Sequence, residues 1–337
     1  MAAPLNWGII ATGGIARAFA LGVAHAKHGR VVAVGSRSRA SAERFARELS
    51  IPRAHESYDA LLADREVEAV YIATPHPQHA EWTIRAARAG KHVLCEKPLA
   101  MTRAEAEQAA AACREANVLL MEAFMYRCHP QTAKIVEIVR SGALGRVRLV
   151  QAAFGFANPF DASNRFWSRE LGGGGILDVG CYPVSFARLI AGADDGQPFA
   201  DPLRVTGEVV RHPHTGVDTW AAATLRFPSG MIAQVSTSIA VTQDNAARIY
   251  GEKAWLHVPE PWIPARESGV VKLHLYRGAA TVPEEIVLQT GEWLYGLEAD
   301  AFANALAAGR RDVPQMSVAD SLGNMAVLDA WRDLPDA

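Results

Sequence analysis

Residues 8–16 read Gly-Ile-Ile-Ala-Thr-Gly-Gly-Ile-Ala, at the end of an apolar run that begins at Trp7. This stretch is similar to the turn G-x-G-x-x-G/A, which joins a strand to a helix and binds the diphosphate of a dinucleotide. Gly13 stands at the second glycine, where a side chain would block the phosphates, and Ala16 stands at the third, where helix and sheet pack closely. Ala11 departs from the pattern at the first glycine, so an ordinary strand–turn–helix corner is the alternative. If the turn binds a diphosphate at the helix N-terminus, the residues that line it are Ala11, Thr12, Gly13, Gly14 and Ile15.

The first 125 residues alternate short apolar runs with longer amphipathic stretches. The runs are continuously apolar, as in parallel strands that are buried on both faces, and the stretches between them have helical spacing. This alternation predicts a doubly wound parallel sheet of the Rossmann type over residues 1–125. The predicted strands are 7–11, 31–35, 69–73, 92–95 and 118–121, and the predicted helices are 15–26, 40–49, 58–63, 79–89 and 103–116.

The pattern changes after Met125, and residues 126–337 read as an α+β domain. Short strands separated by turns such as Pro228-Ser229-Gly230 are typical of antiparallel meanders. We therefore expect a large, mostly antiparallel open sheet in this half of the chain. The predicted strands are 205–211, 220–227, 231–239, 246–250, 254–258 and 270–276, and the predicted helices are 131–140, 176–190, 293–308 and 317–331.

The end of the second predicted strand indicates which dinucleotide is bound. NAD sites usually carry an acidic residue about 20 residues past the glycine motif, where it binds the ribose 2′-hydroxyl. This chain has Ser36-Arg37-Ser38-Arg39 there, and its first following carboxylate is Glu43. Ser36 can donate to a 2′-phosphate and Arg37 can pair with it, so the sequence predicts NADP(H) as the cofactor. A solvated loop with surface arginines is the alternative.

Two further segments follow the third and fourth predicted strands. Residues 74–79 read Thr-Pro-His-Pro-Gln-His, and residues 96–98 read Glu-Lys-Pro. Ligands of open α/β sheets bind at the carboxyl ends of the strands, so both segments are candidates for the cofactor site. Pro98 disfavours a helical conformation at Lys97, and a lysine at that edge could point into the cleft. A surface lysine beside a turn is the alternative.

These segments together resemble the Gfo/Idh/MocA family, named for glucose-fructose oxidoreductase and inositol dehydrogenase. The match extends over essentially the whole chain; its most specific piece is Glu96-Lys97-Pro98, and it includes residues 173–180, Gly-Gly-Gly-Ile-Leu-Asp-Val-Gly. Many members carry a histidine four residues after the aspartate of that run, whereas this chain has Tyr182. Together with residues 121–130, this tyrosine resembles the branch of dimeric dihydrodiol dehydrogenase, NADP-dependent xylose dehydrogenase and glucose-fructose oxidoreductase.

The resemblance implies an NADP(H)-dependent oxidoreductase that acts on a sugar, such as D-xylose, D-glucose or a keto-sugar. It implies that Lys97 and Tyr182 are catalytic, that Asp178 binds substrate hydroxyls or orients the site, and that Arg165 helps to hold the nucleotide. It also implies that the second domain binds substrate and joins copies into a homodimer or a higher homo-oligomer. A trans-1,2-dihydrodiol dehydrogenase and a non-catalytic NADP-binding sensor on the same fold are the alternatives. The further residues expected at the cofactor are Thr74, Pro75, His79, Glu96 and Lys97 itself.

The chemistry of Lys97 and Tyr182 fits this implied role. Hydride transfer between a carbinol carbon and nicotinamide C4 needs a group that handles the hydroxyl proton. A tyrosine hydroxyl, with an ordinary pKa of about 10, is a poor base at neutral pH, and a nearby ammonium lowers that pKa. The pair then acts as a general acid/base. In a helix over 176–190, Asp178 and Tyr182 share one face; the structural alternatives are a packing tyrosine and an aspartate that serves the helix N-terminus.

Composition narrows the possible partners. The chain has 337 residues, 50% of them hydrophobic, and a formal net charge of -2, which gives no electrostatic reason to expect nucleic acid or a membrane surface. We expect no signal peptide, no membrane span and a cytoplasmic location, because the N-terminus has no basic-then-apolar pattern and no apolar run approaches about 18 residues. We also expect free thiols and no metal, since neither cysteines nor histidines have ligand spacing; these are Cys95, Cys113, Cys128, Cys181, His76, His79, His212 and His214. An aromatic set either walls a ring substrate or marks a strand entering the core: Phe154, Phe156, Phe160, Phe166 and Trp167.

Overall fold

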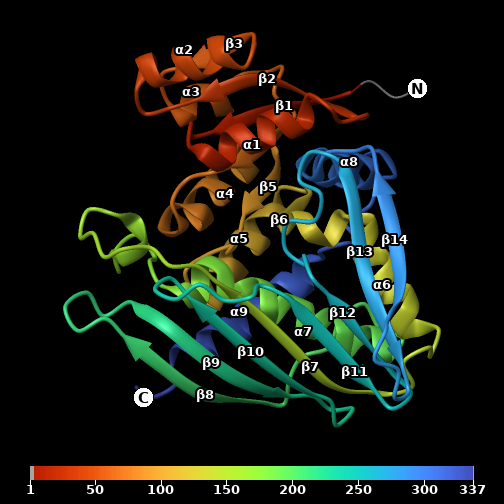
Figure 1. The fold of residues 1–337 in the computed structure, drawn as a ribbon. Helices are drawn as coiled ribbons and strands as arrows, with labels where there is room; N and C mark the ends of the chain where they lie inside the picture. The colour runs from red at the N-terminus through yellow and green to blue at the C-terminus, as the bar shows by residue number, and fades with distance from the viewer. Residues whose placement is uncertain (1–3, 337) are drawn as a thin grey trace. The chain divides into compact units, whose positions relative to one another are not determined.

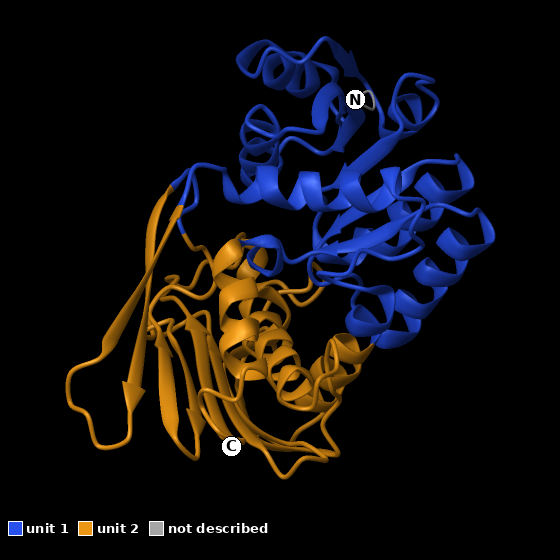
Figure 2. Ribbon diagram, turned by 90° about the vertical axis from the view of Figure 1, so that its right-hand side faces the viewer, with its two compact units in different colours: residues 1–129, 265–268, 290–322 blue, residues 130–264, 269–289, 323–337 orange. Residues whose placement is uncertain are grey.

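The computed structural model describes residues 4–336, which divide into two compact units (Figure 2). Unit 1 contains the described residues up to 129, together with 265–268 and 290–322, and unit 2 contains 130–264, 269–289 and the described residues from 323 onward. The units therefore do not follow one boundary near residue 125. Helix α8 (Leu294–Ala307) belongs to unit 1 because it packs against α1 (Gly14–Val23), and its Asp300 accepts hydrogen bonds from the backbone N–H groups of Lys27 and His28.

Unit 1 contains a six-stranded sheet with the strand order β3-β2-β1-β4-β5-β6 (Figure 1), and all of its neighbouring strands are parallel. This is the Rossmann strand order, so the predicted fold class of the first half is confirmed. The strands are β1 (Leu5–Ile10), β2 (Gly29–Gly35), β3 (Arg53–His55), β4 (Ala69–Ile72), β5 (His92–Glu96) and β6 (Leu120–Ala123). The helices are α2 (Arg39–Glu48), α3 (Tyr58–Leu62), α4 (His79–Arg88) and α5 (Arg103–Glu115), besides α1 and α8; short helical turns are η1 (His76–Gln78) and η2 (Met125–Cys128).

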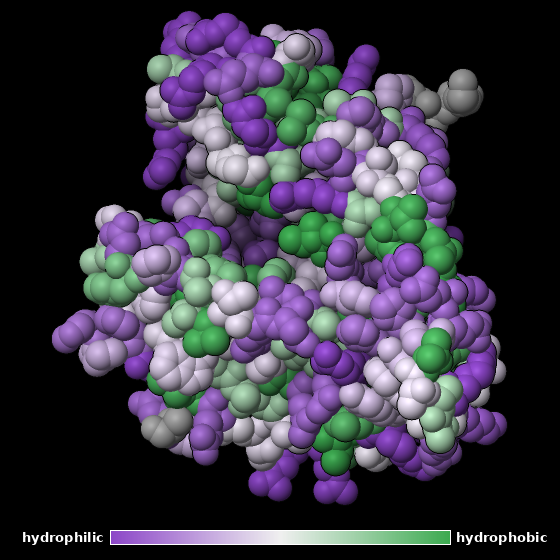
Figure 3. Space-filling model, viewed as in Figure 1, coloured by the Kyte–Doolittle hydropathy of each residue, from purple (hydrophilic) through white to green (hydrophobic). Residues whose placement is uncertain are grey.

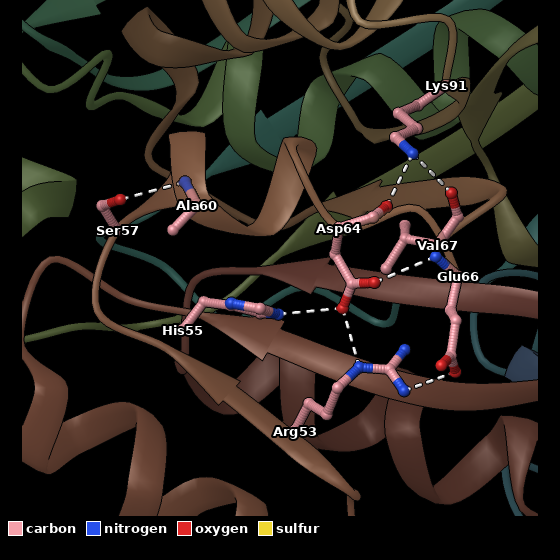
Figure 4. Close-up of polar contacts among 8 residues, drawn as sticks. All are labelled: Arg53, His55, Ser57, Ala60, Asp64, Glu66, Val67 and Lys91. Atoms are coloured by element: carbon pink, nitrogen blue, oxygen red, sulfur yellow. Dashed lines mark hydrogen bonds and ion pairs between the residues drawn. The ribbon is translucent and has the colours of Figure 1, made fainter.

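A polar network fixes the short strand β3 to the loop before β4 (Figure 4). The Asp64 carboxylate accepts from Arg53 Nε at 2.7 Å and from the Glu66 backbone N–H at 2.9 Å, and it lies 3.0 Å from His55 Nε2. Lys91 Nζ donates to the carbonyls of Asp64 and Val67 on the other side of the loop. These bonds lie near the amino ends of β4 and β5, at the opposite end of these strands from their carboxyl ends.

Unit 2 contains an eight-stranded sheet with the order β14-β13-β12-β11-β7-β10-β9-β8 (Figure 1). Its pairs are mostly antiparallel, as predicted, but β7 (Val147–Gly155) pairs parallel with β10 (Ile232–Ser238). The other strands are β8 (Arg204–Arg211), β9 (Asp218–Arg226), β11 (Ala247–Gly251), β12 (Ala254–Val258), β13 (Gly269–Arg277) and β14 (Glu284–Thr290). The helices are α6 (Pro130–Arg140), α7 (Cys181–Asp194) and the part of α9 (Val318–Arg332) from Gly323 onward, with turns at η3 (Arg165–Trp167) and η4 (Ile176–Gly180).

The helix formed by η4 and α7 is the core helix of unit 2. Residues 176–194 are long and apolar enough to cross a membrane, so the expectation that no such run exists is wrong. Almost every side chain of this helix is buried inside unit 2, however, and Arg188 lies within it bound to Asp201, which is how a core helix of a globular domain is built.

On the face drawn in Figure 3, hydrophilic side chains are interspersed with scattered hydrophobic areas.

Candidate active site

The glycine turn between β1 and α1 leaves an open helix N-terminus. Gly13 is the N-cap residue of α1, no side chain caps the helix, and its first turn carries no acidic residue. A Cβ atom built on Gly13 or on Gly14 would have no neighbour within 4 Å. The turn therefore borders open space, and the first N–H groups of a helix have no acceptor within the helix, which is the arrangement that receives a diphosphate.

Ala11 has a φ of 90°, inside the region that favours glycine. Its backbone N–H donates to the Gly35 carbonyl at 3.1 Å, so the turn is anchored to the neighbouring strand β2. The departure noticed in the sequence thus lies at a position where the backbone adopts the conformation of the missing glycine. Ala16, at the third position, is fully buried in α1, where a small side chain permits close packing.

The strand end at β2 separates the two arginines that the sequence places side by side. Arg39 binds Glu43 at 2.9 Å, one helical turn along α2, and approaches Glu56 at 3.7 Å. Arg37 has no carboxylate partner among the described residues and is exposed. Its guanidinium lies near the Tyr58 hydroxyl, where its charge opposes the rise in the pKa of Tyr58 that burial causes.

Ser36 and Ser38 complete this strand end. Ser36 is 7% exposed, and its Oγ accepts from the Ser38 backbone N–H at 3.3 Å, which leaves the hydroxyl proton available for donation. Ser38 is the N-cap of α2 and accepts from the Ser41 N–H. A serine hydroxyl, one arginine that is not bound to a carboxylate and a helix N-terminus without acidic residues are therefore gathered here, and this set fits an anionic 2′-phosphate.

His79 joins the two loops that follow β4 and β5. Its ring is fully buried, with Nδ1 2.7 Å from the Pro98 carbonyl oxygen and Nε2 2.8 Å from the Thr74 carbonyl oxygen. Carbonyl oxygens only accept, so both contacts are hydrogen bonds when both ring nitrogens carry a proton. The predicted segments Thr74-Pro75 and Lys97-Pro98 are thus brought together by a single side chain. Pro75 itself precedes the turn η1.

Glu96 and Lys97 lie at the end of β5, before a cis peptide bond between Lys97 and Pro98. The Glu96 carboxylate is buried, accepts from the Tyr71 hydroxyl, and accepts from the Lys97 backbone N–H at 3.3 Å. Burial raises the pKa of Tyr71 well above its ordinary value, which keeps this donor protonated. The Leu99 N–H donates to Glu122 at 2.8 Å, so the Glu-Lys-Pro turn is fixed on both sides while the Lys97 side chain is half-buried.

In unit 2, Asp178 lies in the turn η4, which is π-helical rather than α-helical. The expected sharing of one face by Asp178 and Tyr182 at i and i+4 assumes α-helical spacing, and the wider π turn alters that spacing. Arg165 of η3 donates to the Asp178 carboxylate at 3.0 Å and stacks over the Phe166 ring. The structure therefore brings Arg165 and Asp178 together, and π turns are frequent at functional sites.

Tyr182 is 4% exposed and lies against two aromatic rings. Its ring centroid is 5.3 Å from that of Phe154 and 6.0 Å from that of Trp262, and Phe154 and Trp262 are stacked on each other. The predicted aromatic set is thus split, because Phe154 alone joins Tyr182. The others gather around Val217 and Ile239 or stack on His212, and they are Phe156, Phe166, Trp167 and Phe160.

Sequence reasoning missed three side chains that shape these loops. Trp262 lies next to Tyr182 but follows a strand far along the chain, and Asp218 and Thr237 bind the glycine run before η4 from neighbouring strands. None of them belongs to a local motif, and only the folded chain brings them to the site. Over the described residues 4–336, no group of three His, Cys, Asp or Glu side chains could hold a metal ion.

Comparison with known proteins identifies the family. Residues 5–124 match the family model "Oxidoreductase family, NAD-binding Rossmann fold", and residues 132–257 match the model of the GFO/IDH/MocA C-terminal domain. The chain belongs to the Gfo/Idh/MocA oxidoreductase family, and it is accordingly an NAD(P)-dependent oxidoreductase.

Curated relatives and solved structures cover nearly the whole chain. A D-xylose 1-dehydrogenase (NADP(+)) from Haloferax volcanii is 36% identical over 97% of this chain and 96% of its own length. A trans-1,2-dihydrobenzene-1,2-diol dehydrogenase from Danio rerio is 33% identical over 97% of this chain and 96% of its own length. A 3-ketoreductase from Actinomadura kijaniata, solved with NADP and TDP-benzene, is 30% identical with a TM-score of 0.87 over 99% of this chain and 98% of that structure. These relatives act on chemically different substrates, so family membership leaves the substrate open.

Proposed function

We propose that this protein is an NADP(H)-dependent dehydrogenase or reductase that transfers a hydride between nicotinamide C4 and a carbinol or carbonyl carbon of a sugar. The observation that carries the cofactor part is the end of β2, where Ser36 stands with Arg37 in place of an acidic residue, and Arg37 has no carboxylate partner among the described residues. The relatives named above as acting with NADP support the same cofactor. The substrate part is supported by the xylose dehydrogenase relative.

The chain's own residues would divide the work as follows. The α1 N-terminus at Gly13 binds the diphosphate, and the bound cofactor supplies or accepts the hydride. Tyr182 would exchange a proton with the substrate hydroxyl, and the Lys97 ammonium would donate a hydrogen bond to the reacting oxygen. Asp178, held by Arg165, binds neighbouring hydroxyls of the substrate. The aromatic rings beside Tyr182 exclude water from the proton-transfer step.

The catalytic part is tested with a panel of aldoses, polyols and diols, with turnover read at the nicotinamide absorbance band. Replacing the acid/base group with Tyr182→Phe should lower kcat/KM about 10²-fold or more while NADPH binding stays within about threefold, and Lys97→Met should lower kcat/KM by a similar factor. Unchanged turnover in both variants would refute the assignment. NADPH binding by a wild type that oxidises or reduces nothing in the panel would favour the non-catalytic sensor.

The cofactor preference is tested by titrating NADPH and NADH while following the nicotinamide fluorescence. Arg37→Gln should weaken NADPH binding about 10- to 100-fold and leave NADH binding nearly unchanged, because it removes one charge-assisted contact with the 2′-phosphate. Arg39→Gln is the matched control, since Arg39 is already occupied by Glu43 and Glu56. Equal or tighter binding of NADH by the wild type would contradict the proposal.

An aromatic diol is a second candidate substrate, because the aromatic rings of Phe154 and Trp262 lie beside the proposed acid/base group Tyr182. The substrate panel separates the two candidates when it includes trans-1,2-dihydrobenzene-1,2-diol. Turnover of this diol at a kcat/KM above that of every sugar would replace the sugar with the diol. In that case Trp262→Leu should lower activity on the diol more than activity on D-xylose.

We also propose a homodimer that forms through the open face of the unit 2 sheet. Large hydrophobic side chains are exposed on strands of this sheet, with Trp220 47% exposed, Ile232 41% and Val270 55%. The resemblance to dimeric relatives supports a second copy as the partner. Light scattering at micromolar concentration should give twice the monomer mass, and the double change Trp220→Glu/Ile232→Glu should give a monomer. A monomeric wild type would refute the dimer.

A cytoplasmic location completes the proposal. All four cysteines are thiols rather than disulfides, and burial raises the pKa of Cys113 to about 12, so that it is unreactive. Free buried thiols suit a reducing compartment. Fractionation of cells with an antibody against the chain should recover it with cytoplasmic markers, and recovery with a membrane or an extracellular fraction would contradict the location.

A further inference from the structure

The carboxylate of Asp218 binds the first turn of the helix that carries Asp178 and Tyr182. Asp218 is the first residue of β9 and is 8% exposed. Its Oδ2 accepts from the Ile176 backbone N–H at 2.6 Å, and the Gly175 N–H also donates to the carboxylate. These N–H groups belong to a helix start, where the helix itself supplies no acceptors. An anionic side chain is favoured there by the helix dipole as well.

The glycine run leaves room for this carboxylate. A Cβ atom on Gly174 would lie 2.3 Å from Asp218 Oδ1, and Gly174 has a φ of +103°, which side chains rarely adopt. Gly174 is therefore required both by its backbone conformation and by the closeness of Asp218. The glycine at position 174 therefore leaves space for the aspartate.

Thr237 of β10 holds the other side of the same peptide unit. Its Oγ1 lies 3.0 Å from the Gly175 carbonyl oxygen and 3.0 Å from the Phe154 carbonyl oxygen, so its single proton serves one of them at a time. A Cβ atom on Gly180 would lie only 3.2 Å from Thr237, so the helix packs tightly on the sheet at this point. Two neighbouring strands, β9 and β10, thus fix where the helix begins.

We propose that Asp218 is a positioning residue for the active site, which holds the glycine run and the first helical turn so that Asp178 and Tyr182 meet the substrate in working geometry. The proposal rests on the proposed function, in which Tyr182 handles the proton. Tyr182 is on the same continuous helix, so a shift or tilt of the first turn is transmitted to it. Displacement of a reacting group by about 1 Å costs on the order of 10²-fold in rate.

The pKa of Asp218 helps to distinguish a residue that positions the active site from one that only stabilises the fold. Burial raises the pKa of Asp218 to about 6, against the opposing effect of the Ile176 and Gly175 N–H groups and of the Arg332 charge. Arg332 of α9 is the charged group that acts on it; β8 places Arg211 opposite Asp218 in register, but that guanidinium binds Asp336. On the neighbouring strand β10, the residue described above is Thr237, which is neutral and adds no charge.

The direction of the pH effect follows from this raised value. Because the folded-state pKa lies above the ordinary value near 3.9, folding stability from this group declines as the pH rises from about 4 to about 6. An ionised Asp218 therefore costs folding stability at neutral pH. Protonation below about pH 6 removes charge from the acceptor of two N–H groups, so the positioning role predicts a fall in kcat on the acid side.

Asp218→Asn tests the proposal, with turnover measured from pH 5 to pH 9 alongside urea unfolding. We expect kcat to fall about 10- to 100-fold, KM and NADPH affinity to stay within about threefold, and the unfolding midpoint not to fall. The acid limb near pH 6 should be present in the wild type and absent from the variant. Asp195→Asn, which changes a carboxylate of the same unit that binds Arg146, is the matched control and should alter none of these.

Thr237→Val keeps the test decisive if Asp218→Asn does not fold. It removes the hydroxyl donor without changing the charge, so kcat should fall several-fold with the acid limb retained. A kcat within twofold of wild type in the folded variants, or an acid limb that persists in Asp218→Asn, would overturn the proposal. Tyr182→Phe separates the proposed function from the positioning role of Asp218. Full turnover in Tyr182→Phe would refute the proposed function. Loss of turnover in Tyr182→Phe but not in the Asp218 and Thr237 variants would refute only the role of Asp218.

Discussion

Replacing Ala11 with glycine should stabilise unit 1, although glycine substitutions usually destabilise proteins. Ala11 has a φ of 90°, where a side chain costs about 1–2 kcal/mol relative to the right-handed region. Glycine removes that cost but adds about 0.5–1 kcal/mol of conformational entropy lost on folding. The difference predicts that Ala11→Gly raises the free energy of unfolding by up to about 1.5 kcal/mol.

Ala16→Gly, five residues later in the same motif, is the matched control with the opposite sign. Ala16 is fully buried in the first half of α1, so glycine there loses about 1 kcal/mol of helix propensity and a buried methyl group worth about 0.8 kcal/mol. We therefore expect a loss of about 1–2 kcal/mol. Equilibrium urea unfolding, followed by tryptophan fluorescence with each transition fitted separately, measures both variants. If Ala11→Gly lowers the unfolding midpoint as Ala16→Gly does, the assignment of strain to residue 11 is wrong.

Two further predictions concern carboxylates that form ion pairs in unit 1. Asp64→Asn should cost about 1–3 kcal/mol at neutral pH, because the amide satisfies its donors less well. Burial alone would raise the pKa of Asp64, but the Glu66 N–H, Arg53 and His55 lower it overall. The contribution of Asp64 to folding stability is therefore present at neutral pH and is lost as the pH falls below about 4. Urea unfolding at pH 3 and pH 7 should show a smaller difference between variant and wild type at pH 3. Asp320→Asn should cost about 3–5 kcal/mol, because it leaves the buried Arg127, 2.7 Å away, without its counter-charge. The double change Arg127→Met/Asp320→Leu should recover most of that loss in the same assay, and a double variant as unstable as the single one would contradict the explanation.

The parts of the fold that the sequence predicts are those whose signal is local. The long apolar runs at β1, β4 and β5 and the amphipathic helices between them carry their own periodicity, so they are found within a few residues. Strand β3 has only three residues, too few to show a period. Strand β7 carries Arg148 and Gln151 on its outer face, and its central, parallel place beside β10 is set by distant pairing rather than by its own composition.

The candidate site divides in the same way. Residues of the glycine turn and of Glu96-Lys97-Pro98 are contiguous, so motif spacing is enough to select them. Asp218 has no such signal, because it is a single acidic residue at the start of a strand, 42 residues from its partner Ile176. The π-helical turn at Asp178 also escapes prediction, since the helical period looks the same in sequence and the difference arises from how the first turn is bound.

Arg37 and Arg39 show how the structure sharpens a prediction that the sequence leaves broad. They are two residues apart in the chain and have the same charge, so from the sequence either could bind a 2′-phosphate. The start of α2 carries Arg39 onto Glu43 one turn later, whereas Arg37 lies before the helix and has no carboxylate within reach among the described residues. A phosphate that recruited Arg39 would have to displace two carboxylates, whereas Arg37 would give up only its contact with the Tyr58 hydroxyl. The preference for NADP(H) should therefore reside almost wholly in one side chain, and the chain should lose it through Arg37 alone.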